Sequence, residues 1–170
     1  MSLGGPGEPN IDPLGSMANR MMVKDNILVV AAAGNEGPGP NTVGAPGNAR
    51  YVLTVTGVNR NGDFPFFPSR GPVGGEREGY AKPDIAAVAG DVSLPTGSLW
   101  AELLKRGLGG SDPGGALASV GGSPADSSCI YGPGIISARS GDDPDTACAL
   151  AGNPKYRFMT GTSMASPMVA

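Results

Sequence analysis

The sequence contains no histidine, so it lacks the one side chain whose ordinary pKa lies near neutral pH. Acid–base chemistry confined to these 170 residues would need a strongly shifted lysine, carboxylate or cysteine. Aromatic residues make up only 5% of the chain, which is little for a surface that stacks on bases or sugars. No apolar run approaches the roughly 18–20 residues that span a bilayer, and residues 1–20 lack the pattern of a signal peptide. The sequence therefore predicts no membrane span.

Positive charge is also scarce, because 12 lysines and arginines stand against 15 aspartates and glutamates, for a formal net charge of −3. The basic residues form no cluster, so neither a nucleic acid nor an anionic membrane surface is expected as a partner. Glycine and proline are abundant, at 29 and 17 residues, as in low-complexity chains. Such chains usually carry a strong net charge when disordered, whereas this one is 39% hydrophobic and nearly neutral. We expect a folded, loop-rich domain.

The N-terminal third has the pattern of an α/β fold. Residues 12–24 predict an amphipathic helix with Asp12 as N-cap and Pro13 at the first helical position. Its expected buried stripe consists of apolar residues at helical spacing: Leu14, Met17, Ala18, Met21 and Met22. Residues 27–33 are apolar without alternation, which is typical of a strand buried on both faces of a parallel sheet. Residues 51–58 predict a second strand, and this order of elements favours an α/β architecture.

The middle of the chain is less regular. Residues 98–106 predict a short helix that ends at Gly107. The stretch from 109 to 128, rich in glycine, serine and proline, is interpreted as a surface insertion. Ile135 and Ile136 indicate a further strand.

A first candidate for chemistry is the segment from Ala33 to Gly37, directly after the predicted buried strand. Ligands bind beyond the carboxyl ends of the strands in open α/β sheets. Asn35 in this segment has an amide N–H that can be presented to a developing oxyanion. The alternative is that Asn35 serves only a tight turn, since asparagine and glycine are common in turns.

A second candidate is the segment from Gly161 to Pro167. A serine at a helix start has its hydroxyl beside the positive end of the helix dipole. At Ser163 this geometry can expose a nucleophile and supply a backbone N–H to its oxyanion. The alternative is plain capping of the helix by serine or threonine, which is far commoner.

Taken together, these segments resemble the subtilisin-like serine proteases, or subtilases. The matching pieces occur in the family's order: MSLGG (1–5), AAAGNEG (31–37), TVGAPG (42–47), FPSRGP (67–72), KPDIAA (82–87) and GTSMASP (161–167). The resemblance covers most of residues 1–90 and 134–170, and leaves 91–133 as a variable insertion. It implies a three-layer α/β fold with a mostly parallel sheet, present here as a partial peptidase domain over residues 1–170.

The resemblance assigns roles to individual residues. Ser163 corresponds to the nucleophile, and Asn35 to the side-chain donor of the oxyanion hole, joined by the Ser163 backbone N–H. Ser2, Leu3 and Gly4 match the strand that pairs with the extended substrate. The walls of the specificity pocket correspond to Ala32, Ala33 and Gly34, and Gly44 lies near its floor. These small residues imply that the pocket takes a large apolar substrate side chain.

One departure from the family is decisive for activity. The catalytic triad runs in the chain order Asp, His, Ser, and in the family both Asp and His precede the SLGG strand with which this chain begins. Without an imidazole Ser163 has no base, and nothing places a lysine beside it. We expect the isolated chain to be inactive and its partner to be the N-terminal half of the same catalytic domain. The alternative is a catalytically inactive, peptide-binding or scaffold relative.

The resemblance also bears on secretion, disulfides and metals. It implies an extracellular enzyme with a polypeptide substrate and no cofactor in the chemistry. In such an enzyme Cys129 and Cys148, the two cysteines, either form a disulfide or remain free thiols. Subtilases often carry structural calcium, but no acidic group here fits a defined calcium loop, and a solvated turn is the preferred interpretation of the acidic cluster Asp142, Asp143 and Asp145.

Overall fold

The computed structural model describes residues 1–74, 79–90, 134–142, 149–150 and 153–170. The elements are α1 (Pro13–Val23), β1 (Val30–Ala32), β2 (Leu53–Val58), β3 (Ile85–Val88), β4 (Ile135–Ala138), β5 (Ala149–Leu150), β6 (Asn153–Met159) and α5 (Thr162–Val169). The predicted helix 98–106, the insertion 91–133, both cysteines, Asp143 and Asp145 lie outside the described residues. In the described part of the chain no helix is long and apolar enough to cross a membrane.

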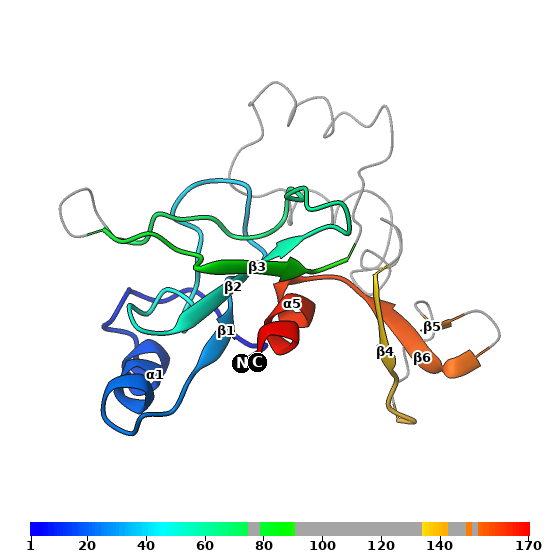
Figure 1. The fold of residues 1–170 in the computed structure, drawn as a ribbon, viewed down its shortest axis with the longest axis horizontal. Helices are drawn as coiled ribbons and strands as arrows, with labels where there is room; N and C mark the ends of the chain where they lie inside the picture. Colours follow the sequence, from blue (N-terminus) through cyan, green and yellow to red (C-terminus); the bar gives the residue numbers. More distant parts are fainter. Residues whose placement is uncertain (75–78, 91–133, 143–148, 151–152) are drawn as a thin grey trace.

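A parallel sheet in the order β1-β2-β3 forms the centre of the molecule (Figure 1). β1 pairs with β2 from Val30 opposite Leu53, and β2 pairs with β3 from Val55 opposite Ile85. All three residues of β1 are buried, as its unbroken apolar run predicted. The predicted start of this strand is wrong, because Ile27 and Leu28 are 48% and 65% exposed. β2 pairs with β1 from Val30 onward, so in the described part of the chain no strand pairs with Ile27 or Leu28.

Helix α1 covers one face of this sheet. Its N-cap is Asp12, as predicted, and the Asp12 Oδ1 accepts hydrogen bonds from the N–H groups of Leu14 and Gly15 at 2.9 and 3.2 Å. Ala18 packs in a cluster with residues from β1 and the β2 region, and Met21 and Met22 pack against it. Met17 was expected in the buried stripe but is 59% exposed. The contact between α1 and the sheet is centred on small residues, so only part of the predicted apolar stripe is buried.

Helix α5 covers the opposite face. Ala165 is fully buried in a second cluster with Val30, Val55 and Ala89. In β1, Ala31 belongs to the α1 cluster and its neighbour Val30 to the α5 cluster, as expected for successive residues of a strand. The helices therefore pack on the two faces of one sheet, which confirms the predicted three-layer α/β fold with a parallel sheet.

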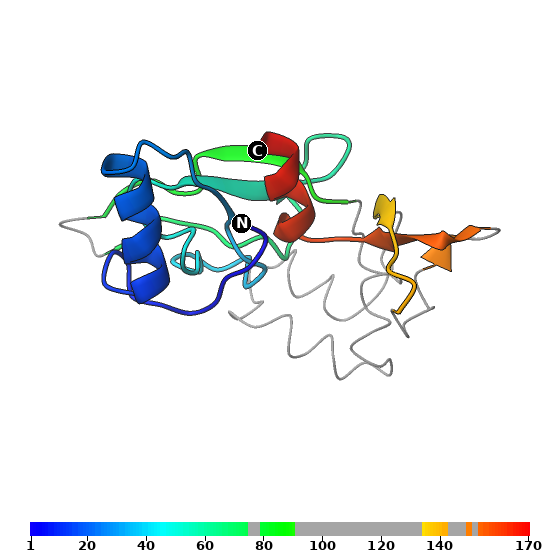
Figure 2. The same ribbon diagram turned by 90° about the horizontal axis from the view of Figure 1, so that it is seen from below.

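A second, antiparallel sheet has the order β4-β6-β5. It lies at the end of the molecule away from α1 (Figures 1 and 2). The strand expected around Ile135 and Ile136 is β4, which pairs with β6 from Ile135 opposite Met159. β6 leads within three residues into α5, so this sheet delivers the chain to the segment that holds Ser163.

A buried lysine joins β2 to the start of β3. Lys82 is 6% exposed, and its Nζ donates to the Val52 carbonyl and to Asp84 Oδ2, the latter at 2.6 Å. The same carboxylate oxygen accepts the Thr54 N–H at 2.7 Å. The ammonium thus has partners for its charge, as a buried charge requires.

In the complete catalytic domain, replacing Lys82 by alanine should lower the free energy of unfolding by about 3 kcal/mol, because it leaves the Val52 carbonyl and the Asp84 carboxylate without their cationic partner. Urea denaturation measures the loss. Lys155→Ala removes an exposed lysine and should change stability by less than about 0.5 kcal/mol. Equal effects of the two substitutions would show that the buried contact contributes nothing.

Candidate active site

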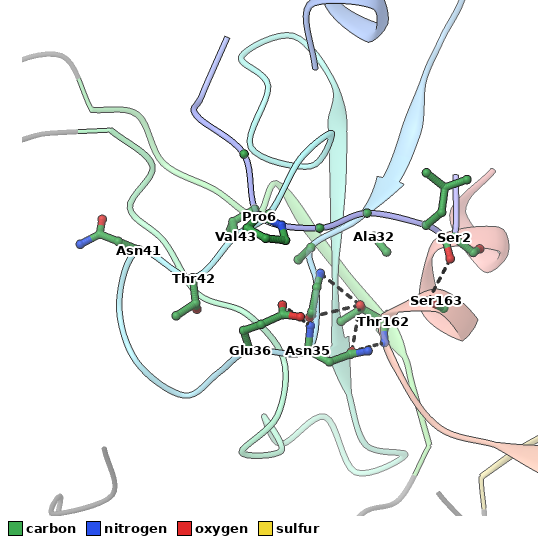
Figure 3. A pocket seen from close by; sticks show the side chains of 17 residues that line it. Ser2, Pro6, Ala32, Asn35, Glu36, Asn41, Thr42, Val43, Thr162 and Ser163 are labelled. Carbon is green, nitrogen blue, oxygen red and sulfur yellow. Dashed lines mark hydrogen bonds between the residues drawn. The ribbon is translucent and has the colours of Figure 1, made fainter. Parts of the chain in front are cut away.

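A pocket of about 470 Å³ lies between residues 2–7, the segment after β1 and the start of α5 (Figure 3). All nine residues that the sequence singled out line it: Ser2, Leu3, Gly4, Ala32, Ala33, Gly34, Asn35, Gly44 and Ser163. They come from four separate stretches of the chain. The fold therefore gathers the predicted nucleophile, the predicted amide donor and the predicted substrate-binding residues around one space.

The position of this pocket follows from the sheet. Asn35 is the third residue after β1, and α5 begins beside the carboxyl ends of β1 and β3. The Gly161 N–H donates to the carbonyl of Ala89, just after β3, at 3.0 Å. The Thr162 hydroxyl lies 3.2 Å from both the N–H and the carbonyl of Gly34, just after β1. Parallel strand ends are the usual location of ligand sites in α/β sheets.

The Asn35 side chain is fixed at its oxygen end. Its Oδ1 accepts the Thr162 N–H at 3.1 Å and lies 3.1 Å from the Thr162 hydroxyl (Figure 3). A backbone N–H only donates, so the atom facing it must be the oxygen of the amide. The Asn35 Nδ2 then lies on the other side and makes no hydrogen bond within the described residues. An exposed, oriented N–H donor is therefore available at the pocket.

Ser163 occupies the second position of α5. Within the described residues its backbone N–H has no hydrogen-bond acceptor, as expected in the first turn of a helix. Its hydroxyl donates to the Ser2 carbonyl at 3.2 Å (Figure 3). The N-cap residue is Gly161, which has no side chain, and the hydroxyls of Thr162 and Ser163 bond to Gly34, Asn35 and Ser2 instead of to N–H groups of α5. Plain capping by Thr162 or Ser163 therefore does not account for either residue.

A carbonyl oxygen cannot act as a base for the Ser163 hydroxyl, because amide oxygens remain unprotonated at any physiological pH. Among the described residues that line the pocket there is no lysine, and Lys82 is bound to Val52 and Asp84. Within the described residues the Ser163 hydroxyl therefore has no hydrogen-bonded base. That the isolated chain is inactive stays a prediction.

Residues 1–5 are held at both ends by backbone hydrogen bonds and leave a free backbone edge between them. Gly5 bridges Ala45 through two backbone hydrogen bonds of 3.0 and 2.8 Å, and Met1 bonds to Val30 and Ala32 of β1. Between these anchors, the N–H and C=O groups of Leu3 and Gly4 have no partner within the described residues. A Cβ on Gly4 would lie 2.5 Å from the Ala45 carbonyl oxygen, so glycine is required for this close approach.

Sequence reasoning missed three residues that support the site. Thr162 holds the Asn35 amide, as described above. Glu36 Oε2 accepts the Asn35 N–H at 2.8 Å and the Ser69 hydroxyl at 2.9 Å. Thr162 and Ser69 stand within recognised motifs, GTSMASP and FPSRGP, but their partners are distant in the chain and no local pattern indicates the contacts.

No group of three or more histidine, cysteine, aspartate or glutamate side chains that could hold a metal occurs within the described ranges. Asp142 is the one member of the predicted acidic cluster that lies inside them, and it is exposed. The interpretation of the acidic cluster as a solvated turn thus stays a prediction.

An α/β fold that presents a serine at a helix start, beside an oriented amide donor and the ends of parallel strands, is typical of a serine hydrolase. Comparison with known proteins specifies the class. The family model described as the subtilase family matches residues 1–170. The chain belongs to the subtilase family of serine-type peptidases.

Individual relatives agree with the family match. Pyrolysin from Pyrococcus furiosus is 46% identical over 57 residues, which are 32% of this chain and 4% of pyrolysin. A structure of proteases from Pseudoalteromonas arctica PAMC 21717 matches 100% of this chain with a TM-score of 0.54 and 23% identity. The S41 psychrophilic protease matches 99% with a TM-score of 0.51 and 20% identity. The chain spans only 35% and 38% of those two structures, and at these identities they support the fold alone.

Proposed function

We propose that this chain is the part of a serine endopeptidase that carries the nucleophile and the oxyanion hole. In this proposal the triad Asp and His belong to an N-terminal part of the same catalytic domain, and the two parts together are the complete enzyme. The observation that carries the proposal is that the Ser163 hydroxyl shares the pocket with two donors that have no acceptor among the described residues, the Ser163 N–H and the Asn35 Nδ2.

The mechanism of the complete enzyme proceeds through an acyl-enzyme. The Ser163 Oγ attacks the carbonyl carbon of the scissile bond while the triad imidazole takes its proton. The resulting oxyanion accepts hydrogen bonds from the Asn35 Nδ2 and the Ser163 N–H. Collapse of this intermediate breaks the C–N bond, and the imidazolium protonates the departing amine. Water then attacks the ester, and its proton passes through the imidazole back to the Ser163 Oγ. The chemistry requires no cofactor.

The substrate is proposed to bind as an added strand. The free N–H and C=O groups of Leu3 and Gly4 are suitable partners for an extended peptide, as in other strand-addition complexes. The side chain on the acyl side of the scissile bond would enter between Ala32, Ala33 and Gly34, with Gly44 near the floor. Because these walls are small, we expect a preference for a large apolar side chain.

The proposed N-terminal part has a place beside β1. The Met1 carbonyl accepts the Ala32 N–H at 3.0 Å, and the Met1 amino nitrogen donates to the Val30 carbonyl. Together these two bonds have the pattern of a parallel strand pair. A segment preceding Met1 in the same direction would continue along β1 toward Ile27 and Leu28, whose side chains are exposed. Such a segment would extend the parallel sheet and cover these apolar residues. We further propose, from family membership, that the complete enzyme is extracellular.

The chain expressed alone should be poorly soluble, because the segment just before β1, where Ile27 and Leu28 are exposed and pair with no strand among the described residues, is available for association with other chains. Size-exclusion chromatography and thermal unfolding measure this directly. Aggregates without a cooperative transition are expected. A monomer with a sharp thermal transition would contradict the prediction and the proposed sheet extension.

The test of the proposed function is to read the coding sequence upstream of Met1 and to express the extended protein. We expect an Asp at a strand end and a His at a helix start upstream, and casein hydrolysis by the extended protein but not by residues 1–170. An upstream region without that Asp and His would overturn the enzyme proposal.

A second candidate function is peptide binding without catalysis. It is favoured by one observation: the Ser163 hydroxyl is held by the Ser2 carbonyl, beside backbone groups of Leu3 and Gly4 that no described residue pairs with. Such a module would hold extended peptides at Leu3 and Gly4. An extended protein that binds peptides but cleaves none of them would favour this function over catalysis.

A further inference from the structure

Glu36 and Ser69 form a reciprocal pair behind the Asn35 loop. The Ser69 hydroxyl donates to Glu36 Oε2 at 2.9 Å, and the Glu36 N–H donates back to the Ser69 Oγ at 3.1 Å. The Ser69 N–H also donates to the Gly34 carbonyl at 3.0 Å. Ser69 is fully buried and is not among the residues that line the pocket, so its side chain cannot touch a substrate bound there.

The pair acts directly on the Asn35 backbone. Glu36 Oε2 accepts the Asn35 N–H at 2.8 Å, a charge-assisted bond, which is stronger than a bond between neutral groups. The preceding residue, Gly34, has a φ of +107°, and a Cβ there would lie 2.4 Å from Glu36 Oε2 and 2.7 Å from the Ser69 Oγ. The carboxylate and the hydroxyl therefore fill the space beside this turn and hold the peptide between Gly34 and Asn35.

Asn35 is thus anchored at both ends. Thr162 binds the oxygen of its side chain, and the Glu36–Ser69 pair binds its backbone N–H. Only when both anchors hold is the direction of the Asn35 Nδ2 determined, since Asn35 itself is exposed in a loop. Preorganised direction is what makes an oxyanion donor effective in a transition state.

We propose that Ser69, acting through the Glu36 carboxylate, is a positioning residue for the Asn35 oxyanion donor; this rests on the proposed function. In the complete enzyme, Ser69→Ala removes the donor to Glu36 Oε2 and leaves the Glu36 N–H without its acceptor. We expect kcat to fall about tenfold, a loss typical of a slightly misplaced catalytic group. KM should stay within about twofold, because ground-state binding does not use the oxyanion donor.

A double-mutant cycle with Asn35→Ala separates positioning from general structural damage. In the Asn35→Ala background, Ser69→Ala should cause no further loss of kcat, since the donor it positions is already gone. Glu36→Gln, which keeps the shape but removes the charge, tests the same coupling should Ser69→Ala fail to fold. Thr54→Val is the matched control, because Thr54 is fully buried and its hydroxyl donates to the Gly47 carbonyl at 2.5 Å. Neither Thr54 nor Gly47 is among the residues that line the pocket. It should lower the melting temperature and leave kcat unchanged.

Two results would overturn the inference while leaving the proposed function intact. One is an unchanged kcat in Ser69→Ala, and the other is an equal loss of kcat with and without Asn35. A complete protein in which hydrolysis does not depend on Ser163 would refute the proposed function and this inference together.

Discussion

Replacing Ser163 by alanine in the complete enzyme should lower kcat for peptide hydrolysis by about 10⁶-fold, a magnitude known for the nucleophile of this family and not calculated from the structure. The reason is that the alanine side chain has no atom to form the acyl-enzyme, so that only substrate binding and oxyanion stabilisation remain. Steady-state hydrolysis of a chromogenic peptide measures the loss. KM should change little, because the hydroxyl contributes little to ground-state binding.

Ser166→Ala is not a suitable control for this substitution, because the Ser166 Oγ lies 3.2 Å from the Ser2 Oγ and supports the binding edge. Ser16→Ala is better, since Ser16 is exposed in α1 and its hydroxyl donates to the Asn10 carbonyl, away from the pocket. It should retain full activity. A Ser163→Ala protein that keeps more than a few per cent of the parent's kcat would refute the assignment of Ser163 as nucleophile.

Replacing Asn35 by alanine should lower kcat by about 10²–10³-fold, which is the loss known for one oxyanion-hole donor in this same family and is adopted on that basis. KM should remain nearly constant, because the Asn35 Nδ2 meets the oxyanion only as charge develops. The control Asn61→Ala removes an exposed loop asparagine and should leave kcat within about twofold of the parent.

Asn35→Asp gives a sharper form of the same test. The aspartate keeps an oxygen for the Thr162 N–H but replaces the Nδ2 donor with a second, negatively charged oxygen. It should fold like the parent and lose at least as much kcat as Asn35→Ala, because the carboxylate repels the oxyanion. If Asn35→Asp were as active as the parent, the donor role of Asn35 would be refuted.

The sequence was a good guide where short-range chemistry determines the structure. Asp12 and Pro13 begin α1 as predicted, since capping depends on residues adjacent in the chain. The unbroken apolar run around Val30 identified a strand covered on both faces. The family motifs identified the residues that the fold brings together around the pocket, because these motifs carry a record of tertiary contacts that composition and periodicity lack.

The errors have a common physical origin in tertiary packing. Met17 fits the helical stripe but is exposed, because the contact between α1 and the sheet is centred on Ala18. Ile27 and Leu28 are as apolar as the buried strand that follows, yet no neighbouring strand among the described residues reaches them. The pairing of Glu36 with Ser69 spans 33 residues, and no local pattern indicates it.

The measurement that tests the central claim most directly is labelling by a fluorophosphonate, followed by peptide mass spectrometry. An activated serine attacks phosphorus, so that an Oγ–P bond forms and fluoride leaves. We predict a single adduct on Ser163 in the complete enzyme, none in its Ser163→Ala variant and none in residues 1–170 alone. A complete protein that carries no adduct on Ser163, or equal labelling of the isolated chain, would contradict the claim that Ser163 is a nucleophile activated by an N-terminal Asp and His.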